Sequence, residues 1–180
     1  MGVLMDPTIG RVIDRCRDGD RDAFDEVVAR YGLQVLRTAR LIVRDDALAE
    51  DVCQETFLKA WRRIGSLRDE DPGPWLTRIA ANESISTWRR RHRFDMLTER
   101  IGRFGASPPP FVSEDRLELA RALDRLSPEH RAAIVLHYYH ELTVDQTAAA
   151  LNVPVDTLKS RLKTALRQLR QLTGVEEKAP

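Results

Sequence analysis

The sequence predicts an all-α protein with two small helical domains joined by a flexible linker. Apolar residues recur at helical spacing along nearly the whole chain, and glycine and proline are concentrated in a few short stretches. The size agrees, because 180 residues with 42% hydrophobic content can form one domain or two small ones. No apolar run approaches the roughly 18 residues of a membrane span, and no signal peptide is evident.

Residues 1–96 carry the pattern of a four-helix domain. Asp6 fits an N-cap with Pro7 at the first helical position, and this first helix ends before residues 18–20. Gly32 is a candidate kink in the second helix. The second and third helices are expected at about 21–43 and 47–64. A turn-rich loop follows at 65–74, and the fourth helix at about 75–93.

The composition changes at the stretch GRFGASPPPF, which contains glycines and three consecutive prolines. We therefore place the linker at residues 97–112, a second helical domain at 113–174 and a tail at 175–180. Ser127 and Pro128 fit a helix cap and a first-turn proline. The segment AAIVLHYYHEL favours a strand locally, but no partner strand is evident, so we assign it as helix.

The stretch AAALNVPVDTLKSRLKTALRQLRQL has the spacing of a helix-turn-helix. Ala148 is small enough for the helix crossing, Asn152 tolerates the positive φ of the turn, and Leu158 returns to the core. The alternative is an amphipathic helix with an ordinary solvated basic face. Here the helix-turn-helix spacing and the excess of basic residues on the second helix occur together, which favours DNA binding. The side chains expected to contact bases or phosphates are Thr157, Lys159, Ser160, Arg161, Lys163 and Thr164.

The fourth helix ends in a cluster of arginines within STWRRRHRF. Cations are favourable at a helix C-terminus, but this many around one turn exceed what the helix dipole needs, so we favour contact with phosphates. Aromatic side chains beside arginines suit unstacked bases of single-stranded DNA, although core packing is the better account of Trp75. The candidate residues are Trp75, Asn82, Ser86, Arg89, Arg90, Arg91 and Arg93.

The third helix carries an acidic strip opposite its apolar face, formed by Glu50, Asp51, Gln54 and Glu55. Paired carboxylates raise the question of a metal, but there is no Glu-x-x-His and no convergent second helix. We expect no metal and no cofactor, and interpret the strip as a docking face for a basic protein partner.

The net charge of +1 is unevenly distributed. Residues 1–73 contain 12 basic and 15 acidic side chains, residues 74–104 contain 7 and 3, and residues 105–180 contain 10 of each. Such a chain should bind DNA poorly by itself, because phosphate neutralisation supplies most non-specific affinity. Cys16 and Cys53 lie on apolar helix faces, which suits reduced core residues in the cytoplasm.

Together these motifs resemble the extracytoplasmic-function group of the sigma-70 family of sigma factors. The blocks DAFDEVVARYG, DDALAEDVCQETFLKAWRRI and PWLTRIAANESISTWRRRHR are similar to region 2. The block from ALDRLSPEHRAAIVLHYYHEL through the helix-turn-helix is similar to region 4. The resemblance implies a factor that is not an enzyme and that directs core RNA polymerase to promoters with two elements.

The resemblance also assigns roles to the candidate residues. Asp51, Gln54 and Glu55 match the surface that docks on core polymerase. The helix at 75–93 and the preceding loop match the part that opens and reads the −10 element, and the second helix of the helix-turn-helix matches the reader of the −35 element. Such factors are usually held inactive by an anti-sigma factor. The chain departs from the family pattern at Asn152, Pro154, Glu83 and Thr87, and these differences concern promoter sequence rather than class.

Two other functions are open to the sequence. A stand-alone helix-turn-helix regulator needs only the C-terminal motif, but it leaves the arginine cluster unexplained. The second is an enzyme with a metal site, for which His137 and His140, at i and i+3, could supply two ligands. However, His130 is a turn or more away, and no cysteine or carboxylate cluster is nearby.

Overall fold

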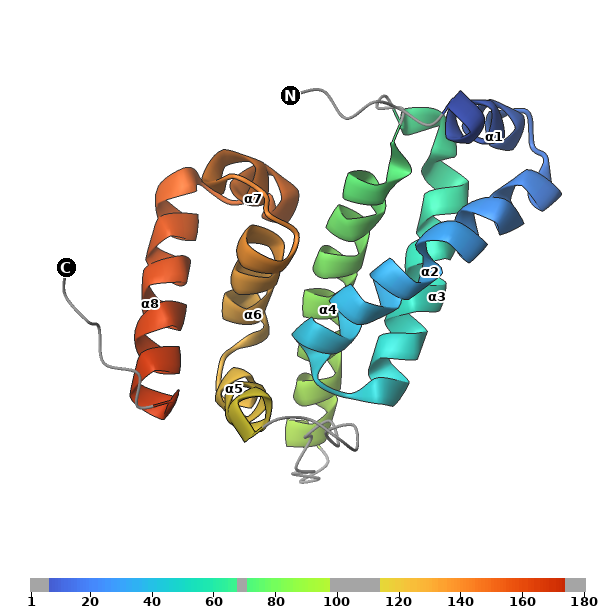
Figure 1. Ribbon diagram of the computed structural model, residues 1–180. Coiled ribbons are helices and arrows are strands. Elements are labelled where there is room, and N and C mark those ends of the chain that lie inside the picture. The colour runs from blue at the N-terminus through green and yellow to red at the C-terminus, as the bar shows by residue number, and fades with distance from the viewer. Residues whose placement is uncertain (1–6, 68–70, 98–113, 174–180) are drawn as a thin grey trace.

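The computed structural model describes residues 7–67, 71–97 and 114–173, and every regular element in these ranges is helical (Figure 1). The N-terminal domain comprises α1 (Pro7–Arg17), α2 (Arg21–Val43), α3 (Asp46–Arg63), the short 3₁₀ helix η1 (Ile64–Ser66) and α4 (Pro72–Leu97). The C-terminal domain comprises α5 (Glu114–Asp124), α6 (Pro128–Ile134), the π-helical stretch η2 (Val135–Tyr139), α7 (Val144–Leu151) and α8 (Val155–Thr173). The predicted all-α fold with two helical domains is confirmed.

Aspartate caps determine where two helices of the N-terminal domain begin. Asp20 accepts a hydrogen bond from the backbone N–H of Ala23 at 3.1 Å, and Asp45 accepts one from Leu48 at 2.8 Å. Helices α2, α3 and α4 pack together around an aromatic centre. There the Phe24 ring meets Trp61 edge to face at a centroid distance of 5.1 Å.

The fourth helix is longer than predicted at both ends. It begins at Pro72, inside the expected loop at 65–74, and continues past Arg93 to Leu97. Pro72 suits a first helical position, and the Asp71 side chain accepts a hydrogen bond from the N–H of Gly73 at 2.9 Å, so the chain is turned into the helix three residues early. Helix α2 runs unbroken through Gly32.

Several expectations fall on residues outside the described ranges: the Asp6 cap, nearly all of the linker at 97–112, and the tail at 175–180. The domain boundaries at 96 and 113 therefore remain predictions. Cys16 is buried and Cys53 half-buried, and both are free thiols. Within the described ranges, no helix combines the length and apolar character needed to cross a membrane.

The C-terminal domain confirms the predicted cap and most of the helical assignment of the ambiguous segment. The Ser127 hydroxyl accepts a hydrogen bond from the N–H of His130 at 3.3 Å, and Pro128 occupies the first turn of α6. The segment AAIVLHYYHEL is helical through Tyr139, its last turn being the π-helical stretch η2, but its final three residues, 140–142, leave the helix, contrary to the prediction. Tyr138 and Tyr139 are exposed at 54% and 49%.

The helix-turn-helix has the predicted geometry. Asn152 lies in the left-handed region at φ 53° and ψ 49°, and the N–H of Val153 donates to the carbonyl of Ala148 at 3.0 Å. Ala148 is 2% exposed and Leu158 is fully buried. Pro154 occupies the N-cap of α8, where its carbonyl accepts from the N–H of Leu158 at 3.0 Å. A capping box between Thr143 and Gln146 begins α7.

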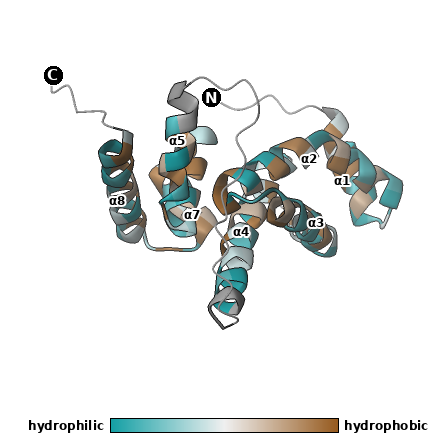
Figure 2. Cartoon of the chain, turned by 90° about the horizontal axis from the view of Figure 1, so that it is seen from below, coloured by the Kyte–Doolittle hydropathy of each residue, from teal (hydrophilic) through white to brown (hydrophobic). Residues whose placement is uncertain are grey.

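The two domains also pack directly against each other. Helix α4 lies beside α6 and α7, and α2 crosses α4 so that its C-terminal end also contacts α6 and η2 (Figure 1), while Figure 2 shows α7 beside α4 from below. Ile42, Ala81 and Ile85 of the N-terminal domain share a buried cluster with residues of α6, η2 and α7, and we call this contact the domain interface. The sequence predicted only a linker between the domains and did not indicate this packing.

The left-handed turn predicts a specific ordering of stabilities at position 152. Replacing Asn152 with Ala should lower the free energy of unfolding by about 1–2 kcal/mol, because a Cβ without a polar partner is disfavoured in this backbone region. Asn152→Gly is the matched control and should be neutral or slightly stabilising, because glycine adopts positive φ without strain. Urea unfolding measures both variants, and equal stability of the Ala and Gly variants would contradict the assignment.

Candidate nucleic-acid interface

Helix α8 presents one apolar and one polar face. Leu158, Leu162 and Ala165 are buried against α5 and α6. On the opposite side, the structure places all six residues that the sequence selected. Thr157, Lys159, Ser160 and Lys163 are exposed, and Arg161 and Thr164 are half-buried. Lys159 lies 3.8 Å from Asp156, which is itself almost fully exposed, so this ion pair holds the lysine only weakly.

The C-terminal half of α4 carries a second cationic surface. Arg89, Arg90, Arg91 and Arg93 are all exposed, as is Ser86 one turn earlier. The Trp88 indole stacks on the His92 ring at a centroid distance of 3.5 Å, so this aromatic side chain has a partner within the helix. Arg89 reaches Glu129 of α6 and Arg90 reaches Glu83 on the side of α3, so the four arginines surround the C-terminal half of α4, and we call them the arginine surface.

A polar hollow of about 700 Å³ lies beside this surface. It brings together Trp75, Asn82 and Ser86, the three candidates that precede the arginines in the sequence. Trp75 is half-buried and also packs against the core of the N-terminal domain, as the core-packing alternative predicted. Asn152, from the turn of the helix-turn-helix, closes the hollow from the other domain.

Two of the candidate residues are held by the C-terminal domain. The Asn82 amide donates to the carbonyls of Ala150 and Arg78, both at 2.8 Å, and Arg89 Nε donates to Glu129 at 2.7 Å. Burial raises the pKa of the Glu129 carboxyl, but hydrogen bonds from its own backbone N–H and from Arg89 outweigh that effect and leave the pKa lowered. Glu129 is therefore a stable anionic partner for Arg89.

The same interface contains polar contacts that sequence reasoning missed. Arg44 donates to Asp124 at 2.6 Å and to the carbonyl of Ala120 at 3.2 Å. The Thr38 hydroxyl, fully buried on α2, lies 2.8 Å from His140 Nε2. The available signal was Thr38 itself, a polar residue on an otherwise apolar face of α2.

The acidic strip lies on the outer face of α3. Glu50, Asp51 and Gln54 are exposed and Glu55 is half-buried. An apolar hollow of about 800 Å³ lies beside Gln54, lined by Phe24, Phe57, Trp61 and other residues of α2 and α3. Leu58 borders it and is 51% exposed. The sequence identified the charged strip but not the apolar hollow next to it.

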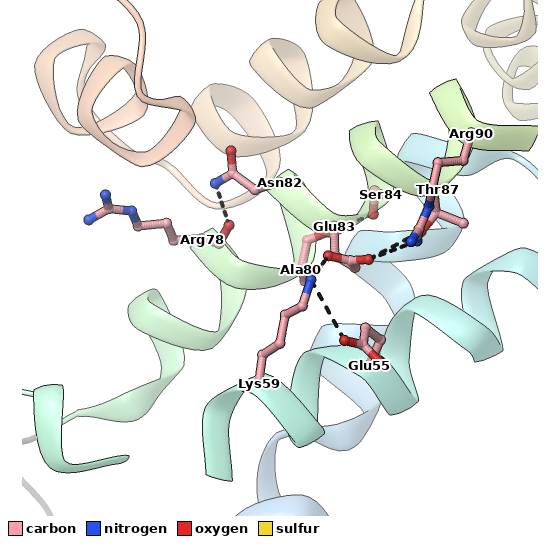
Figure 3. A network of polar contacts seen from close by, with 9 residues as sticks. All are labelled: Glu55, Lys59, Arg78, Ala80, Asn82, Glu83, Ser84, Thr87 and Arg90. Carbon is pink, nitrogen blue, oxygen red and sulfur yellow. Dashed lines mark hydrogen bonds and ion pairs between the residues drawn. The ribbon is translucent and has the colours of Figure 1, made fainter. Parts of the chain in front are cut away.

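A buried carboxylate connects α3 with α4 (Figure 3). The Glu83 side chain is 6% exposed, and it accepts hydrogen bonds from Lys59 of α3 and from Arg90 of α4, the latter at 3.1 Å. Lys59 also lies 3.7 Å from Glu55, so the network reaches the acidic strip. The sequence marked Glu83 only as an unusual residue and did not indicate these partners.

The histidines of the C-terminal domain have partners within the protein. His137 Nδ1 lies 2.7 Å from the carbonyl of Leu142, and His140 contacts Thr38. In the described part of the chain, no group of three or more His, Cys, Asp or Glu side chains could hold a metal ion. The structure therefore provides no donor set from which a metal mechanism could be derived.

Comparison with known proteins matches both domains. Residues 27–94 match the model of Sigma-70 region 2, and residues 122–171 match that of Sigma-70, region 4. The chain is 32% identical over 171 residues to RNA polymerase sigma factor CarQ of Myxococcus xanthus, covering 90% of this chain and 95% of CarQ. It is 38% identical over 160 residues to ECF RNA polymerase sigma factor SigL of Mycobacterium tuberculosis, covering 83% and 86% of the two chains.

A solved structure has the same arrangement of helices. The sigma factor RpoE, crystallised in complex with the anti-sigma factor NepR from Bartonella quintana, superposes with a TM-score of 0.71 at 26% identity. The superposition covers 86% of this chain and 98% of RpoE. The sequence similarity and the fold thus point to the same family.

The half-buried His140 predicts that the domain interface weakens in mild acid. Burial lowers the pKa of His140, so an open form with a solvated ring binds a proton that the closed form excludes. The interface is then fully stable above the ordinary histidine pKa of about 6.5 and loses stability as pH falls toward the lowered value. Two hollows border His140, and the charged residues that line them are Arg30, Arg37 and Glu141 in one and Asp71 in the other.

Fluorescent labels on the two domains, compared between pH 7.5 and pH 5.5, would measure this change in separation. His140→Gln should make the separation independent of pH over that window. His92→Gln serves as the control, because the His92 ring stacks on Trp88 within α4. A pH response that survived in the His140 variant would assign the effect to another group.

Proposed function

The chain belongs to the extracytoplasmic-function group of sigma-70 sigma factors, and we propose specific roles in promoter recognition for the surfaces described above. A sigma factor of this group is not an enzyme; it directs RNA polymerase in transcription initiation through regions 2 and 4. The observation that carries the proposal is the presence, in one chain, of a basic helix-turn-helix face on α8 and an arginine surface beside a polar hollow on α4.

In this proposal α8 reads the −35 element in the major groove. Lys159, Ser160 and Lys163 project from the first half of the helix, which is the part that reaches base edges in helix-turn-helix proteins. Lysine and arginine can donate to guanine or to phosphate, while serine and threonine contact either. Thr157, Arg161 and Thr164 extend the same face along the groove.

The −10 element is assigned to α4. The arginine surface Arg89, Arg90, Arg91 and Arg93 would bind phosphates of the separated strand. The hollow lined by Trp75, Asn82 and Ser86 is polar, adjacent and large enough for an unstacked base. Double-stranded promoter DNA and single-stranded −10 DNA are thus the proposed nucleic-acid partners.

Core RNA polymerase would dock on the acidic strip of α3. Glu50, Asp51 and Gln54 are exposed there, and the apolar hollow beside Gln54 offers buried area in addition to charge complementarity. Because polymerase and promoter are the partners, the proposed site of action is the cytoplasm.

The domain interface gives this arrangement a closed form. Asn82 and Arg89 are bonded to the C-terminal domain, and Asn152 borders the −10 hollow, so these donors become free for promoter DNA when the domains separate. We propose that polymerase binding favours the separated form. An anti-sigma factor, the kind of partner bound to RpoE in the similar structure, would be a protein that favours the closed form.

A stand-alone regulator would behave differently in one experiment. Run-off transcription with core polymerase on a promoter library should yield specific transcripts only when the chain is added. A regulator that needs only α8 would bind a duplex operator by itself and would confer no initiation on core enzyme.

The arginine surface predicts a defect in promoter opening rather than in assembly. Changing Arg89, Arg90 and Arg91 together to Ala should leave binding to core polymerase intact and cut opening about 10-fold or more, with a salt slope lower by about 2 because three phosphate contacts are lost. Permanganate reactivity of the −10 bubble measures opening. Arg11→Ala, an exposed arginine on α1, is the control, and normal reactivity in the triple variant would refute the −10 assignment.

Charge reversal on α3 tests the docking strip. Glu55→Lys should weaken binding to core polymerase, but it also places a cation beside Lys59. Asp51→Lys is the cleaner variant because Asp51 is exposed. We expect it to lower the affinity for core polymerase about 5-fold or more, because it removes a negative charge that attracts the polymerase and the ion pair formed there. Asp18→Lys, in the turn after α1, is the matched control. Unchanged affinity of both strip variants in a titration with core enzyme would contradict the docking role.

A further inference from the structure

We propose that Glu83 is a positioning residue whose buried carboxylate holds the Arg90 guanidinium in place to receive −10 DNA. The proposal rests on the function proposed above, because it takes Arg90 as a DNA contact. It assigns a role to a residue that departs from the family pattern and that lies between Lys59 of α3 and Arg90 of α4 (Figure 3).

Burial makes the ion pairs of Glu83 obligatory. Its side chain is only 6% exposed, and a carboxylate removed from water needs compensating charge and hydrogen bonds. Lys59 reaches it from α3 and Arg90 from α4, so two cations converge on one anion. The carboxylate thereby ties the two helices together at the base of the −10 surface.

Arg90 is held at one nitrogen and remains exposed otherwise. Its Nη2 donates to Glu83 at 3.1 Å and to the Thr87 hydroxyl at 2.9 Å, while the side chain as a whole is 68% exposed. The guanidinium is a rigid planar fork, so fixing one nitrogen also orients the remaining donors. Those donors are then positioned for a phosphate before DNA arrives, which reduces the ordering cost of binding.

Lys59 keeps this anchor from neutralising the DNA-binding surface. Lys59 balances the charge of Glu83, which leaves the positive charge of Arg90 for phosphate, although the half-buried Glu55 beside Lys59 makes the four-residue network neutral as a whole. Arg90 therefore gains an orienting partner and still attracts phosphate. The further contact of Lys59 with Glu55, at 3.7 Å, links this anchor to the acidic strip of α3.

The proposal and simple electrostatics predict opposite results when Glu83 is neutralised. An acid near a DNA-binding surface repels phosphate, so its loss should by itself tighten binding. If Glu83 instead orients Arg90, the same change frees the arginine and weakens binding despite the added positive charge. The sign of the effect therefore separates the two explanations.

The experiment measures promoter binding and −10 opening by reconstituted holoenzyme that carries wild-type chain, Glu83→Gln or Thr87→Val. Glu83→Gln keeps the size of the side chain and removes its charge. Thr87→Val removes the hydroxyl that also accepts a hydrogen bond from Arg90, and it leaves no buried ion unpaired. This variant therefore tests the orientation of Arg90 even where Glu83→Gln fails to fold. We expect each variant to bind promoter DNA about 3-fold to 10-fold more weakly. Unchanged or tighter binding by Thr87→Val, or by a folded Glu83→Gln, would overturn the proposal.

A double-mutant cycle tests the named partner. In an Arg90→Gln background, Glu83→Gln should cause no further loss, whereas in the matched Arg93→Gln background its full loss should remain. Equal losses in both backgrounds would overturn the role of Glu83 alone. Failure of Arg90→Gln itself to weaken opening would instead overturn the −10 role of Arg90 and the inference together, so the two failures are distinguishable.

Discussion

Helix α4 is packed on both of its long sides, and this constraint organises the rest of the molecule. One side completes the core of the N-terminal domain with α2 and α3, and the other side receives α6 and α7 (Figure 1). Only its C-terminal half and the face toward the polar hollow remain for a ligand. Helix α4 therefore contributes to the core of one domain, to the contact with the other, which it shares with α2, and to the proposed −10 surface.

The domain interface, to which α2 and α4 both contribute, has the composition of a contact that can separate. Many of its buried residues are alanines, including Ala81, Ala133 and Ala148, which exclude water but bury little apolar area each. Its remaining strength comes from polar pairs such as Arg44 with Asp124 and Arg89 with Glu129. These groups exchange for water or phosphate when the domains part, so opening costs far less than unfolding either domain.

The parts of the fold that depend on local chemistry could be predicted from the sequence. The helix-turn-helix followed from Ala148, Asn152 and Leu158, whose positions are determined by the turn between two adjacent helices. The start of α4 was placed three residues too late, because Asp71 and Pro72 stand among turn residues that predicted a loop. The domain interface could not be predicted, since Thr38 and His140 lie 102 residues apart and nothing in either local pattern identifies the other. The sequence marked Glu83 as unusual, but its ion pair with Lys59 could not be predicted because Lys59 lies on a different helix.

The geometry also restricts how polymerase can open the chain. A partner that binds closed and open forms equally well shifts nothing, however tightly it binds. The acidic strip lies on α3, which packs mainly on α2 and α4 and keeps its outer face exposed in the closed form. Docking on that strip alone therefore does not separate the domains. The free energy for separation must come from contacts that only the open form can make. These contacts would involve the surfaces of α4 and α7 that face each other in the closed form, or α8 bound at a site away from α4. In the function proposed above, the polymerase therefore has to engage both domains to favour the open form.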